Sequence, residues 1–296
     1  MVTPPPQTSN EFIERQLDDR ARELMKVFDA DILSFTGTLL FGVDDIIRKV
    51  VESMRQNPDA HRKLVVILTT MGGYIEVVQR IVDTFRHHYG TVEFVVPNYA
   101  LSAGTVLVMS GDAIHMNYYS RLGPIDPQVE TTKGRTVSAL GYLAQWERLL
   151  EKARKGTLTT AEAQLMIDGF DQGELYQFEQ ARDLSIELLK KWLVKYKFKN
   201  WDVTETNQIQ VTDAMRQERA EAIAKELNDP EKWHSHSLGI SMDILRRDLN
   251  LRIDDFDANP DIASRIKDYY NLLDDYMMRR DRRGVLHTVG QYVPIE

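Results

Sequence analysis

The sequence contains no cysteine. This absence excludes disulfides, thiol catalysis and cysteine-ligated zinc, so any covalent nucleophile must be an oxygen or an amine. The chain also lacks an apolar run approaching the roughly 18 residues that indicate a membrane span. Its first ten residues, with prolines at positions 4–6, lack the apolar stretch of a signal peptide. We therefore expect a cytoplasmic protein without a membrane span.

An excess of positive charge is also absent. The 296 residues include 45 acidic and 37 basic side chains, which gives a net charge of -8. Nucleic acid and anionic lipid are therefore not expected as partners, because a protein of net negative charge does not attract polyanions. No Gly-x-x-x-x-Gly-Lys-Ser/Thr phosphate loop occurs, so any ATP-driven unfolding must come from a separate unfoldase or adaptor.

What the sequence does contain is enough apolar content, 43%, to build a buried core. Between residues 42 and 111 helical and strand patterns alternate, which is typical of βαβ units and a parallel sheet. The segments 64–69 and 91–97 are short and almost continuously apolar, as expected of strands covered on both faces. Further strands are predicted at 31–36 and 113–116. The predicted helices span residues 11–29, 44–55, 74–88, 102–110, 138–155, 160–168, 174–196, 213–228, 241–250 and 261–282.

The expected architecture is thus α/β, and it has three parts. An N-terminal extension and helix cover residues 1–30, and an α/β core with a parallel sheet covers residues 31–136. A large helical C-terminal elaboration covers residues 137–296 and completes the site near residues 233–241.

Two strand-to-helix loops are the candidates for chemistry, because ligands bind beyond the carboxyl ends of parallel strands. In the first loop, Gly72 and Gly73 follow a predicted buried strand and leave backbone amides free for an oxyanion. In the second loop, Ser102 lies among small residues at the start of a helix. Serine alone at such a position is usually only a helix cap, and paired glycines are usually only a turn. Their occurrence on consecutive βα units favours a catalytic interpretation.

Four segments in this order resemble the Clp-protease and signal-peptide-peptidase superfamily, and most closely its serine dehydrogenase proteinase branch. The segments are 68–73 (LTTMGG), 100–105 (ALSAGT), 111–112 (GD) and 122–128 (LGPIDPQ). The resemblance is most specific from residue 64 to residue 128, with a looser match at 233–251. It implies the fold shared by Clp proteases and crotonases, and a serine peptidase that works as a homo-oligomer on polypeptide substrates without a cofactor.

By the same resemblance, Ser102 takes the position of the nucleophile. The amides of Gly72 or Gly73 and of Ala103 take the positions of the oxyanion hole.

The family pattern offers several candidates for the general base. Asp126 occupies the neighbourhood where Clp-type proteases have their histidine, while His236 lies near the position of their aspartate. This arrangement suggests a triad with exchanged partners, in which His236 takes the proton of Ser102 and Asp126 orients the imidazole. Signal peptide peptidases use a lysine instead, so Lys152 and Lys155 are alternative bases and Lys133 is a further candidate.

Other interpretations remain open for the same residues. Asp126 lies in a sequence that favours a turn, so it can have a purely structural role. His234 and His236 lack a third nearby ligand, so no metal site is expected. A crotonase-like acyl-coenzyme A enzyme would use the same pair of loop amides for a thioester enolate, but it would need a carboxylate in place of a serine nucleophile. A non-catalytic scaffold, whose helical second half binds partners, is the third alternative.

Overall fold

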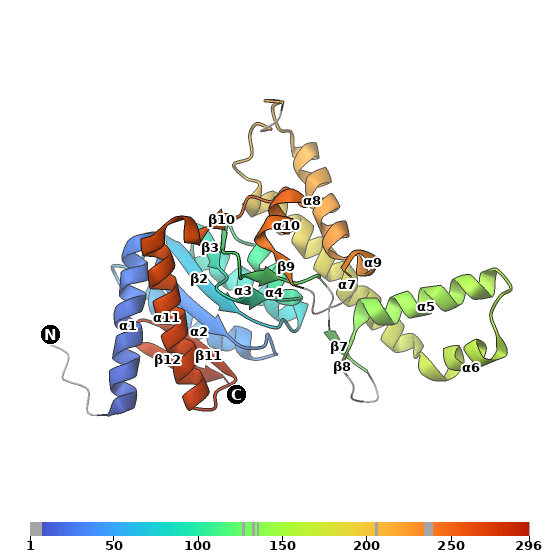
Figure 1. The fold of residues 1–296 in the computed structure, drawn as a ribbon, viewed down its shortest axis with the longest axis horizontal. Helices are drawn as coiled ribbons and strands as arrows, with labels where there is room; N and C mark the ends of the chain where they lie inside the picture. The colour runs from blue at the N-terminus through green and yellow to red at the C-terminus, as the bar shows by residue number, and fades with distance from the viewer. Residues whose placement is uncertain are drawn as a thin grey trace.

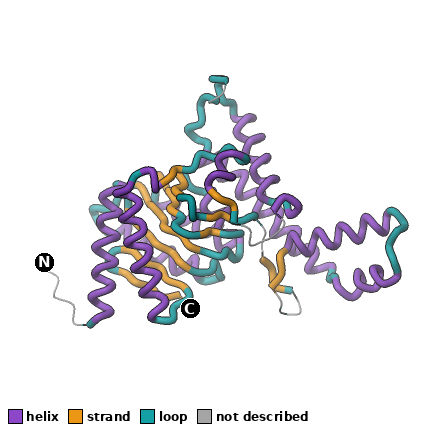
Figure 2. The backbone as a smooth tube through the Cα atoms, in the orientation of Figure 1, coloured by secondary structure: helices purple, strands orange, loops and turns teal. Residues whose placement is uncertain are grey.

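A seven-stranded sheet with the order β10-β5-β3-β2-β1-β11-β12 forms the centre of the protein (Figures 1 and 2). The computed structural model describes residues 8–125, 128–131, 134, 136–204, 207–233 and 239–295. Strands β1, β2, β3, β5 and β10 are parallel, whereas β11 is antiparallel to β1 and β12 to β11. Their bounds are β1 Asp31–Thr36, β2 Lys63–Thr69, β3 Thr91–Val95, β5 Ala113–Met116, β10 Asp254–Asp255, β11 Gly284–Thr288 and β12 Gln291–Ile295.

Both faces of this sheet are covered by helices, which explains why β2 is an almost continuous run of apolar residues. In β2, Leu64 and Val66 belong to the hydrophobic cluster on one face, whereas Val65 and Ile67 belong to the cluster on the other. Successive side chains of a strand point to opposite faces, so an alternating sequence would have left one face polar. The predicted strands at 31–36, 64–69 and 113–116 are confirmed.

Helices form one layer on each face of the sheet. On one face α1 (Ser9–Phe28) and α11 (Pro260–Arg279) lie side by side, although they come from opposite ends of the chain (Figure 1). The other face is covered by helices that share the larger hydrophobic cluster. These are α2 (Val43–Arg55), α3 (Ile75–His88), α4 (Ala103–Met109), α7 (Gln172–Trp192), α8 (Asp213–Leu227) and α10 (Met242–Arg247).

A helical arm extends away from the sheet (Figure 1). It consists of α5 (Ala139–Arg154), α6 (Thr160–Gly169) and the first half of α7, and it has its own small hydrophobic cluster around Phe178. The second half of α7 returns to the main core and continues as a π-helix, Leu193–Lys197. The helix predicted at 174–196 is therefore confirmed.

Several elements were not predicted from the sequence. The hairpin of β11 and β12 extends the sheet with residues that lie far beyond the predicted 31–136 core. Helix α10 is shorter than the predicted 241–250. The other additions are short: β4 (Tyr99–Ala100), β6 (Arg121–Leu122), β7 (Gln128–Glu130), β8 (Thr136–Ser138), α9 (Pro230–Trp233), β9 (Ile240–Ser241) and a 3-10 helix (Phe256–Ala258).

Candidate active site

Ser102 lies in the turn that joins β4 to α4, and its backbone is strained. Its φ of 54° and ψ of -124° fall in a region that residues with a Cβ atom avoid. Such a conformation costs about 1–3 kcal/mol and persists only where the surrounding structure enforces it. The side chain of Ser102 makes no capping hydrogen bond to α4, so the interpretation of this serine as a simple helix cap is not supported. A strained strand-to-helix turn is also how α/β-hydrolases present a nucleophilic serine.

Gly72 lies directly against this turn. A Cβ atom at Gly72 would be 2.7 Å from the carbonyl oxygen of Leu101 and 2.8 Å from the Cβ of Ser102. The φ of Gly72 is 104°, which also favours glycine. Only glycine therefore fits at this position, and the two loops predicted to carry the chemistry are in contact.

Backbone hydrogen bonds join the two loops. The amide of Thr70 donates to Tyr99 O at 3.0 Å, and the amide of Leu101 donates to Thr70 O at 2.9 Å. Gly104 allows this close approach, because a Cβ there would lie 2.4 Å from the Cγ2 of Thr70. The position of Ser102 relative to Gly72 is thus fixed by main-chain contacts.

The amides in these loops differ in their hydrogen bonding. Gly72 N–H donates to Thr70 Oγ1 at 3.0 Å. Within the part of the chain that the structure describes, the amides of Gly73 and Ala103 donate no hydrogen bond. These two amides are therefore the ones that remain available to an oxyanion beside Ser102.

The loop after β1 supports the two glycines from the other side. Leu39 N donates to Gly72 O at 2.8 Å, and Tyr74 N donates to Leu39 O at 2.9 Å. A Cβ at Gly73 would lie 2.3 Å from Leu39 O, so glycine is required here as well.

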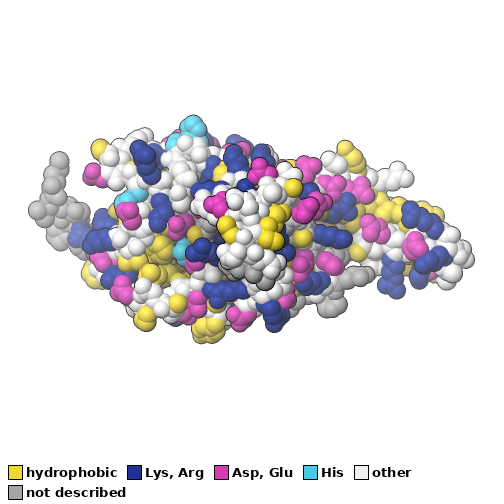
Figure 3. Space-filling view, turned by 90° about the horizontal axis from the view of Figure 1, so that it is seen from above, with side chains coloured by type: hydrophobic (Ala, Val, Ile, Leu, Met, Phe, Trp, Pro, Cys, Tyr) yellow, Lys and Arg dark blue, Asp and Glu magenta, His cyan; other side chains and the backbone are white. Residues whose placement is uncertain are grey.

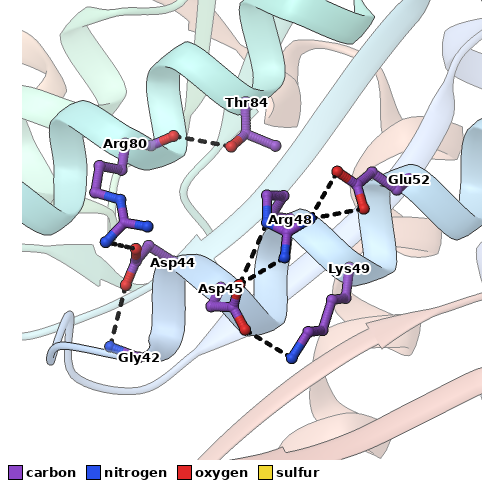
Figure 4. A network of polar contacts seen from close by, with 8 residues as sticks. All are labelled: Gly42, Asp44, Asp45, Arg48, Lys49, Glu52, Arg80 and Thr84. Carbon is purple, nitrogen blue, oxygen red and sulfur yellow. Dashed lines mark hydrogen bonds and ion pairs between the residues drawn. The ribbon is translucent and has the colours of Figure 1, made fainter.

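A charged network then holds the helices behind these loops. Asp44 at the start of α2 accepts a hydrogen bond from Gly42 N and forms an ion pair with Arg80 of α3 at 2.8 Å (Figure 4). Further along α2, Arg48 bridges Asp45 and Glu52 (Figure 4). The network links α2 to α3, the helix that begins directly after the glycine loop.

A small second sheet gathers the remaining segments of the site. In this sheet β6 is parallel to β4 and antiparallel to β9, with Ala100 beside Leu122 and Leu122 beside Ile240. The buried hydroxyl of Thr105 in α4 lies 2.9 Å from both Ala100 O and Gly123 O and accepts from Gly123 N–H at 3.0 Å. Three segments distant in sequence are thereby held next to the serine turn.

Of the predicted partners of Ser102, only two lie in the described part of the chain. Asp126, His236 and Lys133 fall outside the described residues. Lys152 and Lys155 lie at the outer end of α5, away from the sheet (Figure 1).

Both lysines have carboxylate partners on the arm. Lys152 is paired with Glu162 and Lys155 with Glu151 at 3.0 Å. The hydrogen bond from Lys152 lowers the pKa of Glu162 to about 2. The structure therefore does not bring either lysine to Ser102 within one chain.

A cavity of about 290 Å³ opens beside the two loops and was not predicted. Its wall includes Met71 and Leu101, which precede Gly72 and Ser102, together with Asn98, Tyr99, Tyr119, Arg121 and Gly239. Arg121 directly precedes the Leu-Gly-Pro segment, and this adjacency is the signal that could have identified it. A larger cavity of about 420 Å³ lies elsewhere, between α1 and β12.

The described residues include no group of three or more histidine, aspartate or glutamate side chains that could hold a metal ion. In the same part of the chain, no helix combines the length and apolar character needed to cross a membrane. Figure 3 shows lysine and arginine side chains interspersed with aspartate and glutamate across the visible face, with no broad patch of one sign.

The family described as ClpP-like SDH-type serine proteinase matches residues 13–164 of the chain. Two curated relatives are uncharacterized proteins of Methanocaldococcus jannaschii. One is 22% identical over 231 residues, which are 77% of this chain and 65% of the relative. The other is 29% identical over 86 residues, which are 29% of this chain and 28% of the relative. The chain thus spans less than two thirds of the length of these relatives.

Among solved structures, a mutant of a membrane-bound stomatin-specific protease in complex with a substrate peptide is 14% identical, with a TM-score of 0.42. The alignment covers 75% of this chain and 72% of that one. The ClpP protease catalytic domain of Plasmodium falciparum is 11% identical, with a TM-score of 0.44, and covers 86% and 94% of the two chains.

Proposed function

The chain belongs to the ClpP-like SDH-type serine proteinase family, and on this basis we propose that it is a serine endopeptidase with Ser102 as nucleophile. The observation that carries the proposal is the strained turn of Ser102 held in contact with Gly72. Strain of this kind recurs where a nucleophile must be exposed to a reacting carbonyl at the start of a helix.

The amides of Gly73 and Ala103 are the proposed oxyanion hole. They lie on the two loops that meet at Ser102, and neither donates a hydrogen bond within the described residues. Gly72 N–H is already satisfied by Thr70, so its role is to allow close approach and not to donate. Two amide donors aimed at a developing oxyanion stabilise the transition state more than the ground state, which is what lowers the barrier.

We propose His236 as the general base and Asp126 as the residue that orients it. The small sheet supports this assignment, because Leu122 pairs with Ile240 and lies beside Ala100. Asp126 follows Leu122 by four residues and His236 precedes Ile240 by four, and four residues span at most about 14 Å. Both proposed residues thus belong to chain segments that adjoin the small sheet in sequence, and this supports the assignment.

The proposed reaction proceeds through an acyl-enzyme. Ser102 Oγ attacks the scissile carbonyl carbon while His236 takes the hydroxyl proton, and the two amides hold the resulting oxyanion. The C–N bond then breaks, and the amine leaves with the proton from His236. Water, deprotonated by His236, hydrolyses the ester and regenerates Ser102.

Lys152 and Lys155 remain alternative bases only for a site that is completed by another subunit, because the arm directs them away from Ser102 of the same chain (Figure 1). We also propose that the protein works as a homo-oligomer. The arm exposes Leu165 and Ile167, which are 64% and 75% accessible, and such side chains favour a subunit contact.

The deciding experiment compares Ser102→Ala with Ser110→Ala. Both serines are buried and lie at opposite ends of α4. We expect Ser102→Ala to abolish cleavage of an unfolded protein and labelling by a fluorophosphonate, while Ser110→Ala retains both. His236→Ala should lose activity and Lys152→Ala should keep it. Wild-type cleavage by Ser102→Ala would overturn the proposal, and coenzyme A binding without labelling would favour an acyl-coenzyme A enzyme instead.

A further inference from the structure

The cavity of about 290 Å³ beside the serine turn is lined by residues that are sequence neighbours of Ser102 and Gly72. Leu101 directly precedes Ser102, and Met71 directly precedes Gly72, where an added Cβ would lie 2.8 Å from the Cβ of Ser102. Any group of a bound polypeptide that enters this cavity is therefore close to the bond being cleaved. Tyr119 and Arg121 also line this cavity.

Among the described residues that line this cavity, Arg121 carries the only charged side chain. Its Nη1 donates to the carbonyl oxygens of Tyr118 and Ser120, both at 2.8 Å. Among the residues that the structure describes, no carboxylate forms an ion pair with this guanidinium. The hydrogens on Nε and Nη2 therefore remain for a ligand, and they match the fork geometry of a carboxylate.

The position of Arg121 is fixed before any ligand binds. Its backbone amide donates to Asn98 O at 2.8 Å. The aliphatic part of its side chain lies against Gly239, where a Cβ would be 2.6 Å from Cγ. Any side chain at position 239 would displace Arg121, so the observed position of Arg121 requires glycine there.

The turn that precedes Arg121 is rigid as well. Asn117 Oδ1 accepts from the amides of Tyr119 and Ser120, at 3.0 and 3.1 Å. Ser120 Oγ donates to Val96 O at 2.6 Å, which anchors the turn to the end of β3. The turn exposes Tyr118 and Tyr119, and Met71, which also lines the cavity, is 54% accessible. A pre-positioned guanidinium thus lies among exposed apolar side chains.

We propose that Arg121 binds a carboxylate of the polypeptide substrate next to the scissile bond, and that the enzyme therefore prefers peptides with an acidic group between apolar residues. This inference rests on the proposed peptidase function and names its substrate class. The carboxylate comes either from an aspartate or glutamate side chain or from the free C-terminus of a peptide.

The test measures binding separately from cleavage. Four fluorescent apolar peptides carry glutamate or glutamine at the centre and a free or amidated C-terminus. Fluorescence anisotropy with the Ser102→Ala protein gives their affinities without turnover. We expect about tenfold tighter binding for the peptides with the recognised carboxylate, since a charge-assisted bond of this size is typical. The glutamate–glutamine and acid–amide differences identify which carboxylate is recognised.

Arg121→Gln in the Ser102→Ala background should remove this preference, and Arg121→Lys should keep part of it. Arg62→Gln is the matched control, because Arg62 is exposed, lies at the amino end of β2 and has no ion pair among the described residues. Equal affinity for all four peptides, or an equal loss for all four in Arg121→Gln, overturns the inference.

Cleavage by the protein with Ser102 intact separates the two proposals. Arg121-dependent binding without cleavage of any peptide keeps the carboxylate site and overturns the peptidase function. Cleavage with the same kcat/KM for acidic and neutral peptides keeps the peptidase function and overturns the carboxylate site.

Discussion

At the scale of single residues, the site depends on backbone conformations that few side chains tolerate. Ser102 has a positive φ although it is not glycine, and Gly72 has no space for a Cβ next to it. The strained turn persists because the main chain of Thr70 holds Leu101 in place from the neighbouring loop. The chemistry at Ser102 is therefore expected to be sensitive to one added methyl group.

Gly72→Ala tests this sensitivity. The added Cβ would overlap Leu101 O and the Cβ of Ser102, and the φ of 104° adds strain of about 1 kcal/mol or more. We expect the rate of fluorophosphonate labelling at Ser102 to fall at least about 100-fold. Gly90→Ala is the control, because nothing lies within 4 Å of a Cβ there. Labelling of Gly72→Ala at the rate of the control would contradict the described contact.

Asp112 is a second residue whose surroundings lead to a prediction. Burial alone would raise its pKa, but hydrogen bonds from Lys199, Val92 N–H and Arg86 lower the pKa below the usual 3.8. Asp112 and Arg86 are only 10% and 9% accessible. A carboxyl with a lowered folded-state pKa stabilises the fold above its unfolded pKa, and this stability is lost as pH falls through the folded pKa.

Asp112→Asn is therefore expected to lower the free energy of unfolding at pH 6 by about 3 kcal/mol, since it leaves Arg86 without its partner. The wild type should lose more stability than Asp112→Asn between pH 6 and pH 3. Urea denaturation at both pH values measures this difference. Asp59→Asn, at an exposed position, should follow the wild type, and parallel pH profiles for all three proteins would refute the role of Asp112.

At the scale of elements, the small sheet of β4, β6 and β9 organises the site more than any helix does. Each of its strands has two residues, so their own ladder hydrogen bonds contribute little stability. The sheet is held from behind by α4, whose Thr105 hydroxyl bridges the end of β4 and the residue after β6. This buried hydroxyl thus helps to hold the residues that directly follow β4 and β6.

Thr105→Val removes this hydroxyl and keeps the shape of the side chain. The buried Gly123 N–H would lose one of its two acceptors and keep only Ala100 O at 3.2 Å, and the hydroxyl's own hydrogen bond would also be lost, which together cost about 1 kcal/mol. We expect lower thermal stability and a larger loss in the labelling rate of Ser102. Thr84→Val is the comparison, because Thr84 Oγ1 only donates to Arg80 O on the surface of α3 (Figure 4). If the two variants behave alike, the bridge by Thr105 is not important.

At the scale of the whole molecule, the arm and the sheet core have separate hydrophobic clusters. The arm's hydrophobic cluster contains Ala139, Leu143, Leu175 and Phe178, and none of these belongs to the clusters that flank the sheet. In contrast, α1 and α11, which come from the two ends of the chain, form one layer that covers one face of the sheet (Figure 2). Local opening of the arm should therefore occur without unfolding of the core.

Phe178→Ala tests this separation. Truncation of a fully buried phenylalanine costs about 3–5 kcal/mol in a well-packed cluster. We expect amide hydrogen exchange to become faster in α5, α6 and the first half of α7, while β1, β2 and β3 keep their protection. Equally faster exchange in those strands would show that the arm and the core unfold together.

The sequence alone determined the parallel core and the two loops of the site. The apolar run of β2 follows from burial on both faces. Gly72 and Ser102 follow strands of consecutive βα units, where a parallel sheet exposes its loops. The missing cysteine excluded thiol catalysis. All of these are local properties, which short stretches of sequence carry.

Only the tertiary structure decided which distant segments meet. The two-residue strands β4, β6 and β9 are too short for a periodic pattern, and β11 reaches β1 across almost the whole chain. The structure also shows that the amide of Gly72 is hydrogen-bonded whereas those of Gly73 and Ala103 donate no hydrogen bond within the described residues. It places Lys152 on the outer part of the arm. Hydrogen bonding of single amides and long-range pairing depend on packing in three dimensions, and no local pattern in the sequence encodes them.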